Sequence, residues 1–401
     1  MGRFIVIVID GLGVGAMDDV YTTRREDIGS NTFRHIVEEN NYLKLNNLEK
    51  MGIMNVIDYE TCVMKKSLNC TYGISALEYQ GADSFLGHQE IVALNSSSKF
   101  KEAFNEHIDE IYKELKSKKY KVMYKGDKLK VLLVEDAIII GDSIEGDLGK
   151  IYSVTGDLNR ISYEQILKVG KIIRNKVKVP RVVVNGCLVN FEEMVNSIKE
   201  VNGKCVGINA AQCGVYKRGY KTMNLISNEN CDNQICSILG KKQILVTLIG
   251  KAAEIINNPY GKSILAKDTE KVLKLTIEEM QKNQKIFILS NVQGTDLAGH
   301  LQDSKKYANE LSIVDKHLGK IINVMDNEDI LLVIGDHGND PTIGHNKHTR
   351  EYVPVLVFGK QIQKGFIGEF STLSDIGITV LEYFKVENID KNKSFLRKLI
   401  K

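Results

Sequence analysis

The segment Ile330-Leu331-Leu332-Val333-Ile334-Gly335-Asp336-His337-Gly338-Asn339-Asp340-Pro341-Thr342 joins an apolar run to a cluster of polar side chains. The apolar part predicts a buried strand that is covered on both faces. Asp336 and His337 follow it directly, at the place where ligands bind in open α/β sheets. Carboxylate and imidazole ligands together suit Mn²⁺ or Zn²⁺. If these residues were only structural, aspartates and histidines would have to be buried next to each other, which is uncommon. The segment therefore predicts a metal site at the end of a central strand.

Other apolar runs predict further strands of the same sheet. These strands are residues 4–9, 285–290 and 353–358, and helical patterns lie between them at 268–282 and 305–325. Strands that alternate with helices predict an α/β fold with a doubly wound, mostly parallel sheet. The first strand leads into Asp10-Gly11-Leu12-Gly13-Val14-Gly15. Its GxGxG spacing differs from the GxGxxG of dinucleotide-binding turns, so a dehydrogenase is a distant alternative.

The middle of the chain has a different pattern. Polar breaks at Asn95-Ser96-Ser97-Ser98 and Lys217-Arg218-Gly219-Tyr220 enclose a charged helical stretch, many turn residues and short apolar runs. The runs predict short strands at residues 130–134, 137–140 and 181–184. We therefore expect a core made of residues 1–98 and 219–401, with an α+β domain inserted at residues 99–218.

Composition disfavours several classes of partner. The net charge is +3 and the basic residues are spread along the chain, which argues against nucleic acid as the main partner. The longest apolar runs are too short to span a membrane, and the N-terminus lacks the pattern of a signal peptide. The seven cysteines include no CxxC pair. Their odd number and scatter indicate free thiols, so we expect a cytoplasmic protein.

Two further motifs hold candidate site residues. In Gly81-Ala82-Asp83-Ser84-Phe85-Leu86-Gly87-His88-Gln89-Glu90, either Asp83 or Ser84 would cap a helix well. A hydroxyl at a helix N-terminus is also well placed to hold a phosphoryl group. Asp296 and His300 stand four residues apart, so they can converge on one ion if the segment is helical. Alone they would more often form a surface pair, just as Asp10 alone would be an ordinary turn aspartate.

Taken together, these residues predict two neighbouring metal sites. Asp10, Ser84, Asp336 and His337 would form one site, and Asp296, His300 and His348 the other. His345 is expected to face solvent. Two divalent ions about 4 Å apart would activate the serine hydroxyl and clamp phosphate oxygens during in-line displacement. The chemistry predicted is phosphoryl transfer through a phosphoserine.

The motifs resemble those of the alkaline phosphatase superfamily and, within it, the phosphopentomutases. The resemblance rests on Asp10-Gly11, Gly-x-Asp-Ser-x-x-Gly-His-x-Glu at 81–90, Asp-x-x-x-His at 296–300, and the two segments at 336–342 and 348–354. It implies an alkaline phosphatase-like core, an inserted cap, two Mn²⁺ ions held by the residues named above, and Ser84 as nucleophile. The implied activity moves phosphate between the C1 and C5 oxygens of a pentose, with Lys251 contacting the phosphate.

Several positions differ from the usual family pattern. Ser84 replaces a threonine, Ala82 a lysine and Gln89 a tryptophan, and the Asp296–His300 spacing is closer to that of cofactor-independent phosphoglycerate mutases. In the cap, Asp157 ends a stretch that matches the family only loosely, and Asn185 stands where an arginine usually binds phosphate. Arg181 and Arg218 are candidates to replace that arginine, so Asp157, Arg218 and Lys251 are the expected substrate-binding residues.

The leading hypothesis is therefore a Mn²⁺-dependent phosphosugar mutase of the phosphopentomutase type. Its partner would be a small phosphorylated sugar such as ribose 1-phosphate. A mutase paralogue acting on another phosphorylated substrate and a phosphohydrolase on the same metals are the main alternatives. A non-catalytic protein is disfavoured because buried carboxylates and histidines without a metal would be unfavourable.

Overall fold

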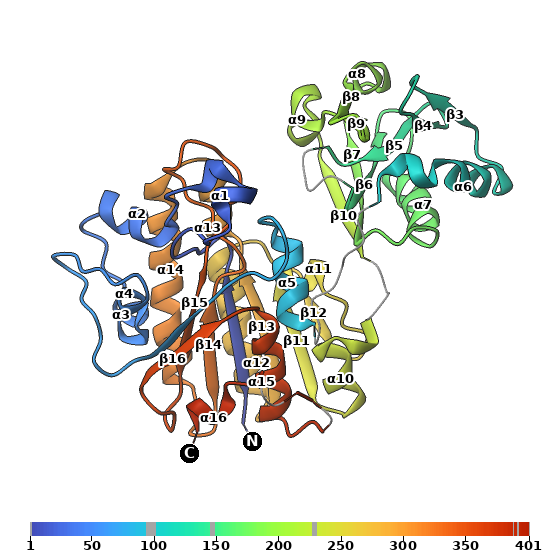
Figure 1. Ribbon diagram of the computed structural model, residues 1–401. Coiled ribbons are helices and arrows are strands. Elements are labelled where there is room, and N and C mark those ends of the chain that lie inside the picture. Colours follow the sequence, from blue (N-terminus) through green and yellow to red (C-terminus); the bar gives the residue numbers. More distant parts are fainter. Residues whose placement is uncertain are drawn as a thin grey trace. The chain divides into compact units, whose positions relative to one another are not determined.

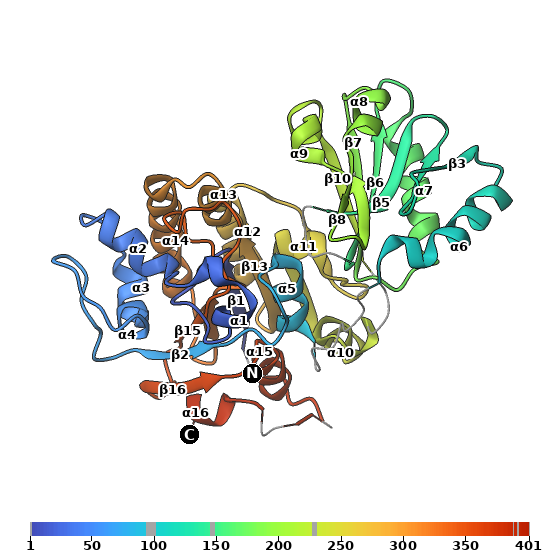
Figure 2. The ribbon, with the colours of Figure 1, turned by 45° about the horizontal axis from the view of Figure 1, so that its top comes forward.

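The computed structural model describes residues 2–93, 102–144, 149–226, 231–387, 389–390 and 393–400. They fall into two compact units, one of Met1–Ser97 with Asn230–Lys401 and one of Ser98–Glu229, which we call the core unit and the cap unit. The expected break at residues 95–98 lies outside the described residues. Figures 1 and 2 show the two units, each with a sheet of its own.

The core unit is built on an eight-stranded sheet with the order β12-β11-β13-β1-β14-β15-β2-β16. All neighbouring pairs are parallel except the two that involve β15. The strands are β1 (Phe4–Ile9), β2 (Thr71–Ser75), β11 (Leu245–Gly250), β12 (Lys262–Ile264), β13 (Ile286–Val292), β14 (Ile330–Ile334), β15 (Val353–Phe358) and β16 (Gly365–Phe370). The predicted α/β fold with a mostly parallel sheet is confirmed.

Helices cover both faces of this sheet (Figure 1). The longest are α12 (Thr269–Lys282) and α14 (Ser304–Asn323), which agree closely with the predicted helices. The others are α1 (Val20–Thr23), α2 (Thr32–Glu39), α3 (Asn46–Met51), α4 (Ile53–Val56), α5 (Ser84–Val92), α10 (Ile235–Lys241), α11 (Lys251–Ile255), α13 (Gly294–His300), α15 (Ser374–Tyr383) and α16 (Leu396–Leu399).

Strand β1 is apolar on both sides because both sides are covered. Ile5, Ile7 and Ile9 pack into one core cluster with α2, α3, α12 and α14. Phe4 on the opposite side contacts Tyr383 of α15, with the rings edge to face at 5.3 Å. Each fully buried side chain of this size contributes roughly 1.5–3 kcal/mol. This burial fixes the position of the strand whose end carries Asp10.

The cap unit contains a six-stranded mixed sheet with the order β10-β7-β6-β5-β4-β3. Its strands are β3 (Val122–Lys125), β4 (Val131–Val134), β5 (Ile138–Asp142), β6 (Ile151–Asp157), β7 (Arg181–Cys187) and β10 (Lys221–Ile226). Helices α6 (Phe104–Ser117) and α7 (Tyr163–Arg174) share one apolar cluster with the sheet. A second cluster on the other face joins α8 (Phe191–Asn196), α9 (Ala210–Cys213) and the hairpin β8 (Ile198–Val201)–β9 (Cys205–Ile208) to β4 and β5.

The end of the cap unit lies later in the chain than we expected. The expected boundary was at residue 218, but β10 pairs antiparallel with β7 over its whole length, from Lys221 to Ile226. Six ladder positions therefore tie the segment after the Gly219-Tyr220 turn to the cap sheet. The turn is a connection within the cap unit, and the unit continues to Glu229.

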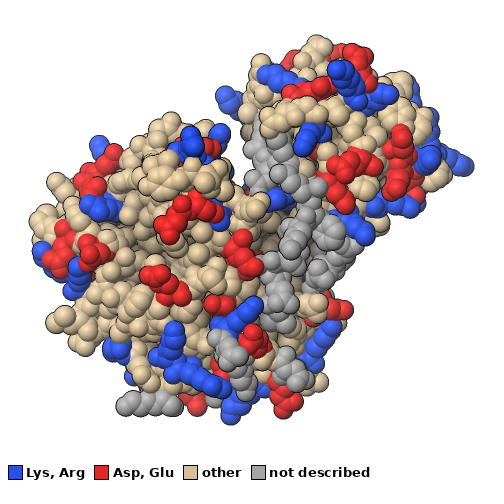
Figure 3. All heavy atoms as spheres, viewed as in Figure 1, with Lys and Arg blue, Asp and Glu red and all other residues tan. Residues whose placement is uncertain are grey.

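The surface agrees with the even spread of charge in the sequence. On the face drawn in Figure 3, basic and acidic side chains alternate over both units and no broad field of one sign is visible. Within the part of the chain that the structure describes, no helix is long and apolar enough to cross a membrane.

Candidate dimetal centre

The candidate site lies at the carboxyl ends of the central strands of the core sheet. Strand β1 lies between β13 and β14 and is parallel to both, so the three strands end at the same edge. Asp10 follows β1, Asn291 is near the end of β13, and Asp336 follows β14. Three segments far apart in the sequence thus bring polar side chains together, as open α/β sheets commonly do at this edge.

Ser84 is brought to this edge by helix α5, which begins at Ser84 itself. The side chain of Asp83 caps the helix by accepting a hydrogen bond from the Leu86 amide at 3.0 Å. Of the two possible caps, Asp83 therefore fills the role, which leaves the Ser84 hydroxyl available. Gly87 allows the helix to lie close to the site, because a Cβ there would be 2.5 Å from the carbonyl oxygen of Asp336.

The first cluster consists of Asp10, Asp336 and His337, all fully buried. One ligand atom from each lies within 4.8 Å of the others. The Ser84 hydroxyl donates to Asp336 Oδ2 at 2.6 Å and lies 3.3 Å from Asp10 Oδ1. His337 Nε2 lies 3.4 Å from Asp10 Oδ1 and 3.5 Å from Asp336 Oδ2. The structure therefore brings together the four residues expected at the first metal.

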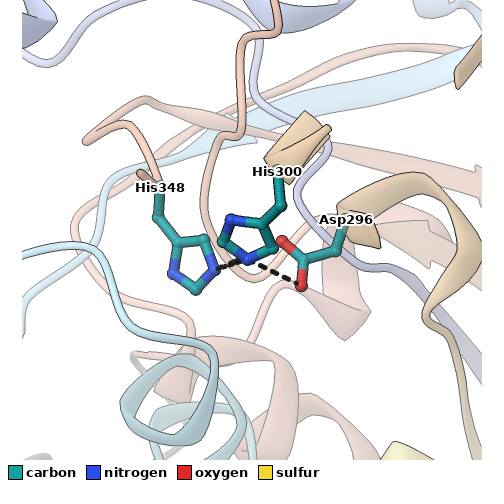
Figure 4. Close-up of side chains that lie close together, drawn as sticks. All are labelled: Asp296, His300 and His348. Carbon is teal, nitrogen blue, oxygen red and sulfur yellow. Dashed lines mark hydrogen bonds and ion pairs between the residues drawn. The ribbon is translucent and has the colours of Figure 1, made fainter. Parts of the chain in front are cut away.

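The second cluster consists of Asp296, His300 and His348 (Figure 4). Asp296 and His300 lie on α13, which is helical as their spacing required. Asp296 Oδ1 lies 3.2 Å from His348 Nε2, and Asp296 Oδ2 lies 3.5 Å from His300 Nε2. The two histidine Nε2 atoms face each other at 3.0 Å. The three residues expected at the second metal thus also converge.

The hydrogen bonds of the histidines test whether these residues fit a metal. The Nδ1 atoms of His300, His337 and His348 each donate to a main-chain carbonyl, of Asn346, Gly338 and Ala82, at 2.8–3.0 Å. In the neutral ring, these bonds place the proton on Nδ1 and leave a lone pair on Nε2 for an ion. His337 Nε2 is buried and has no hydrogen-bond partner among the described residues. The Nε2 lone pairs of His300 and His348 lie 3.0 Å apart, so they repel each other unless a cation lies between them. Metal-binding histidines typically donate such a hydrogen bond from the ring nitrogen that does not bind the ion. The donor set therefore fits two divalent ions.

Its neighbours hold Asp336 in the ionised form. Burial raises the pKa of Asp336, but the charge of His337 and the hydrogen bond from His88 hold it well below its usual value. Burial lowers the pKa of His337, but Asp336 and Asp10 raise it to about 10. A proton on His337 therefore balances the buried carboxylates when no ion is bound. A divalent ion would displace that proton and take over its role.

Lys251 lies between the two clusters. Its Nζ is 2.8 Å from Asp10 Oδ2 and 3.6 Å from Asp296 Oδ2. Burial lowers the pKa of Lys251, but these two carboxylates raise it above its usual value. The residue before it, Gly250, has φ +76°, and a Cβ there would be 2.4 Å from the Asn291 carbonyl oxygen. Lys251 therefore carries a fixed positive charge, suited to a phosphate oxygen, at a turn that requires glycine.

Three supporting residues were not among the expected ligands or substrate-binding residues. His88 Nδ1 donates to the Ser84 carbonyl at 2.8 Å and lies 3.2 Å from Asp336 Oδ2. Asn291 Nδ2 lies 3.0 Å from both Asp10 Oδ2 and His88 Nε2. Asn339 Nδ2 donates to Asp296 Oδ1 at 2.8 Å. His88 and Asn339 fall inside the quoted motifs, which was a usable signal. Asn291 lies within an ordinary apolar strand and gave none.

Arg350 orients the segment that leads to Ser84. Its guanidinium donates to the carbonyls of Leu77, Tyr79 and Gly81 at 2.6–3.0 Å, and its Nε donates to Asp19. The side chain is buried, and three carbonyls of one short segment converge on it. The segment just before the nucleophile is thereby held by a single cation.

The structure gives the surroundings of three further residues, and the expected role of Asp157 and Arg218 in substrate binding stays a prediction. His345 does not simply face solvent, because its Nε2 is 3.1 Å from Oδ1 of the buried Asp27. Asp157 is buried and accepts from the main-chain amides of Asn159 and Phe191, which is a structural role. Arg218 pairs with Glu193 at 3.0 Å.

The chain is similar to known proteins over its whole length. Residues 233–388, which carry Lys251 and the second cluster, match the family model of the metalloenzyme superfamily. The whole chain is 26% identical over 410 residues to a phosphopentomutase of Clostridium novyi, with full coverage of both chains. It is 29% identical to a phosphopentomutase of Caldanaerobacter subterraneus, covering 99% of this chain and 98% of the relative. The chain is a phosphopentomutase-like enzyme. The family resemblance inferred from the motifs is confirmed.

Solved structures give more distant likenesses. A protein of Pyrococcus horikoshii aligns with a TM-score of 0.45 and 16% identity, covering 96% of this chain and 98% of its own. A phosphoglycerate mutase of Leishmania mexicana aligns with a TM-score of 0.45 and 11% identity, covering 97% and 96%.

Proposed function

We propose that this phosphopentomutase-like enzyme is a dimetal phosphosugar mutase that moves phosphate between the C1 and C5 oxygens of a pentose. Asp10, Ser84, Asp336 and His337 would hold one ion, and Asp296, His300 and His348 the other. The single observation that carries the proposal is the Ser84 hydroxyl, which lies 2.6 Å from Asp336 at the first residue of α5 and at the edge of the candidate metal cluster. The full-length similarity to phosphopentomutases supports the pentose assignment.

The proposed reaction proceeds through two balanced transfers. Ser84 Oγ attacks phosphorus, loses its proton, and forms a phosphoserine while the bond from phosphorus to the sugar oxygen breaks. The released sugar oxygen takes up a proton. In the second transfer the other hydroxyl of the sugar attacks the phosphorus of the phosphoserine and loses its proton, the bond from phosphorus to Ser84 Oγ breaks, and Oγ takes up a proton. Bound divalent ions, which we propose to be Mn²⁺, supply charge stabilisation and lower the pKa of the serine hydroxyl.

The residues of the chain divide the remaining tasks. The Lys251 ammonium neutralises the carboxylates of Asp10 and Asp296 at rest and would bind a phosphate oxygen when substrate enters. The N-terminus of α5 would add a favourable field for the phosphoserine, since helix N-termini attract anions. His88 and Asn291 hold Asp336 and Asp10 in place.

The test is an assay of ribose 1-phosphate with added Mn²⁺ that follows ribose 5-phosphate and free phosphate together. Isomerisation without phosphate release, lost in Ser84→Ala, is the expected result. Steady release of phosphate would make the chain a phosphohydrolase instead. An enzyme that holds two ions but leaves ribose 1-phosphate unchanged would have a different phosphorylated substrate. That alternative has support in Asn185, which stands at the position of the usual phosphate-binding arginine.

A further inference from the structure

A fully buried carboxylate outside both metal clusters lies beside the loop that carries His348. Asp27 ends the short 3-10 helix η1 (Arg25–Asp27), and none of its surface is exposed. It belongs to neither cluster of candidate ligands. A buried carboxylate is unfavourable unless cations and N–H donors surround it, so the partners of Asp27 indicate its role.

Asp27 contacts the loop on both sides of His348. Its Oδ1 lies 3.1 Å from His345 Nε2, and its Oδ2 accepts from the Arg350 amide at 2.9 Å. His345 Nδ1 accepts from the Lys347 amide at 3.2 Å. In the neutral ring, this bond places the proton on Nε2, which then donates it to Asp27. One carboxylate therefore holds the loop both before and after His348.

Arg24 extends this hold to the main chain of His348 itself. Its Nε donates to Asp27 Oδ2 at 2.5 Å, and its Nη2 donates to the carbonyl oxygen of His348 at 2.8 Å. The donors of a guanidinium lie in one plane at fixed angles. The ion pair with Asp27 therefore fixes the direction of the bond to His348.

The main chain at His348 decides where the imidazole points. The Nδ1 of its ring donates to the Ala82 carbonyl, and its Nε2 lies 3.2 Å from Asp296 Oδ1 and 3.0 Å from His300 Nε2 (Figure 4). A shift of the loop would move this Nε2 away from the other two ligands of the second cluster. Asp10 of the first cluster, in contrast, directly follows the buried strand β1.

We propose that Asp27 is a positioning residue that acts through Arg24 and His345 to aim His348 at the second ion. This inference rests on the dimetal centre of the proposed function but not on the identity of the sugar. Loss of a residue that orients a metal ligand typically weakens metal binding by about 10- to 100-fold. In Asp27→Asn the new NH₂ group would face an N–H donor in either orientation, because both carboxylate oxygens accept from donors.

The test measures each ion site alone by calorimetric titration of Mn²⁺ into the metal-free, full-length chain. Asp336→Asn leaves the second cluster intact, and Asp296→Asn leaves the first cluster intact. Asp27→Asn is then added to each of these variants. We expect it to weaken Mn²⁺ binding by about 10- to 100-fold in the Asp336→Asn chain and by less than about twofold in the Asp296→Asn chain.

Asp315→Asn is the matched control for the loss of a buried carboxylate. Asp315 is 6% exposed, and its Oδ1 accepts from the amides of Asn47 and Leu48 at 2.9 and 2.8 Å. These amides belong to the first turn of α3 and to neither metal cluster. Added to the Asp336→Asn chain, Asp315→Asn should therefore leave the affinity for Mn²⁺ unchanged.

Two results would overturn the inference while leaving the proposed function intact. One is equal Mn²⁺ affinity of the Asp336→Asn chain with and without Asp27→Asn. The other is an equal loss in the Asp27→Asn and Asp315→Asn chains, which would show only general destabilisation. If the Asp336→Asn chain binds no Mn²⁺ at all, the second metal site is itself contradicted, and the positioning role with it.

A second variant covers the case in which Asp27→Asn does not fold, as judged by circular dichroism. Arg24→Met removes the bond to the His348 carbonyl but leaves Asp27 with its other two donors. It should also weaken Mn²⁺ binding at the second cluster selectively. Unchanged affinity in this variant would overturn the inference as well.

Discussion

The core and cap units both gather polar side chains, but in different places on their sheets. In the core unit Asp10 and Asp336 follow the ends of parallel strands, and most of the other polar groups stand in short sequence motifs. In the cap unit they lie along the face of a sheet, at alternate positions of three strands. The first arrangement is built for fixed ligand geometry at one point. The second spreads hydrogen-bonding groups over the face of a sheet.

The largest expected effect is the loss of activity when the proposed nucleophile of the core unit is removed. Ser84→Ala should reduce mutase activity by ~10⁴-fold or more, as removal of a nucleophile does in other enzymes. Ser84→Thr, which keeps the hydroxyl, should retain measurable activity. Steady-state kinetics of both variants and of the unmodified chain measure these activities. An active Ser84→Ala enzyme would rule out the serine as nucleophile.

The next effect sharpens the assignment of the two clusters. Asp336→Asn and Asp296→Asn should each remove one bound Mn²⁺ per chain, and each should lower activity by ~10²-fold or more because the charge stabilisation of one ion is lost. Removing both ions with a chelator should lower the melting temperature by several degrees, since an ion that binds only the folded state stabilises it. Elemental analysis and thermal melts measure these changes. A full complement of two ions in either variant would contradict the ligand assignment.

A smaller effect tests how the core unit positions its nucleophile. Arg350→Lys keeps the charge but cannot reach three carbonyls at once, so kcat should fall by ~10-fold while the content of two ions is retained. The matched comparison is Arg350→Ala, which should also lose roughly 1–3 kcal/mol of stability because three buried carbonyls lose their donor. A change in KM alone, with kcat intact, would show that Arg350 serves substrate binding instead.

The smallest effect is on stability and depends on pH. The hydrogen bond to Asp340 raises the pKa of His35 above its usual value, although burial lowers it. Protonated His35 therefore stabilises the fold at pH values below its unfolded pKa of about 6.5, and this contribution is lost as pH rises through the higher folded pKa. The loss should be roughly 1.5 kcal/mol, typical of a hydrogen bond to a charged group. Urea melts of the unmodified chain and His35→Gln at two pH values measure it, and an equal pH dependence in both would contradict the assignment.

The difference between local motifs in the core unit and long-range strand pairing in the cap unit explains what the sequence could predict. Strands β1, β14 and β15 were predicted with their observed bounds, because continuous apolar runs ending at polar motifs have few other interpretations. Asn291 was missed because one amide inside a buried strand carries no local signal. The cap boundary was missed because β10 is partly exposed and pairs with a strand far earlier in the chain. Asn185 and Thr222 come together only through that pairing, so no local motif could reveal their contact.

The most direct test of the account is to follow the phosphate itself. Ribose 1-phosphate labelled in its phosphate group is mixed with the Mn²⁺-loaded enzyme, the reaction is quenched early, and the protein is digested for mass spectrometry. We predict label on Ser84 that later appears in ribose 5-phosphate, and no protein label in Ser84→Ala. Label that passes to product or to free phosphate without ever residing on Ser84 would contradict the phosphoserine mechanism.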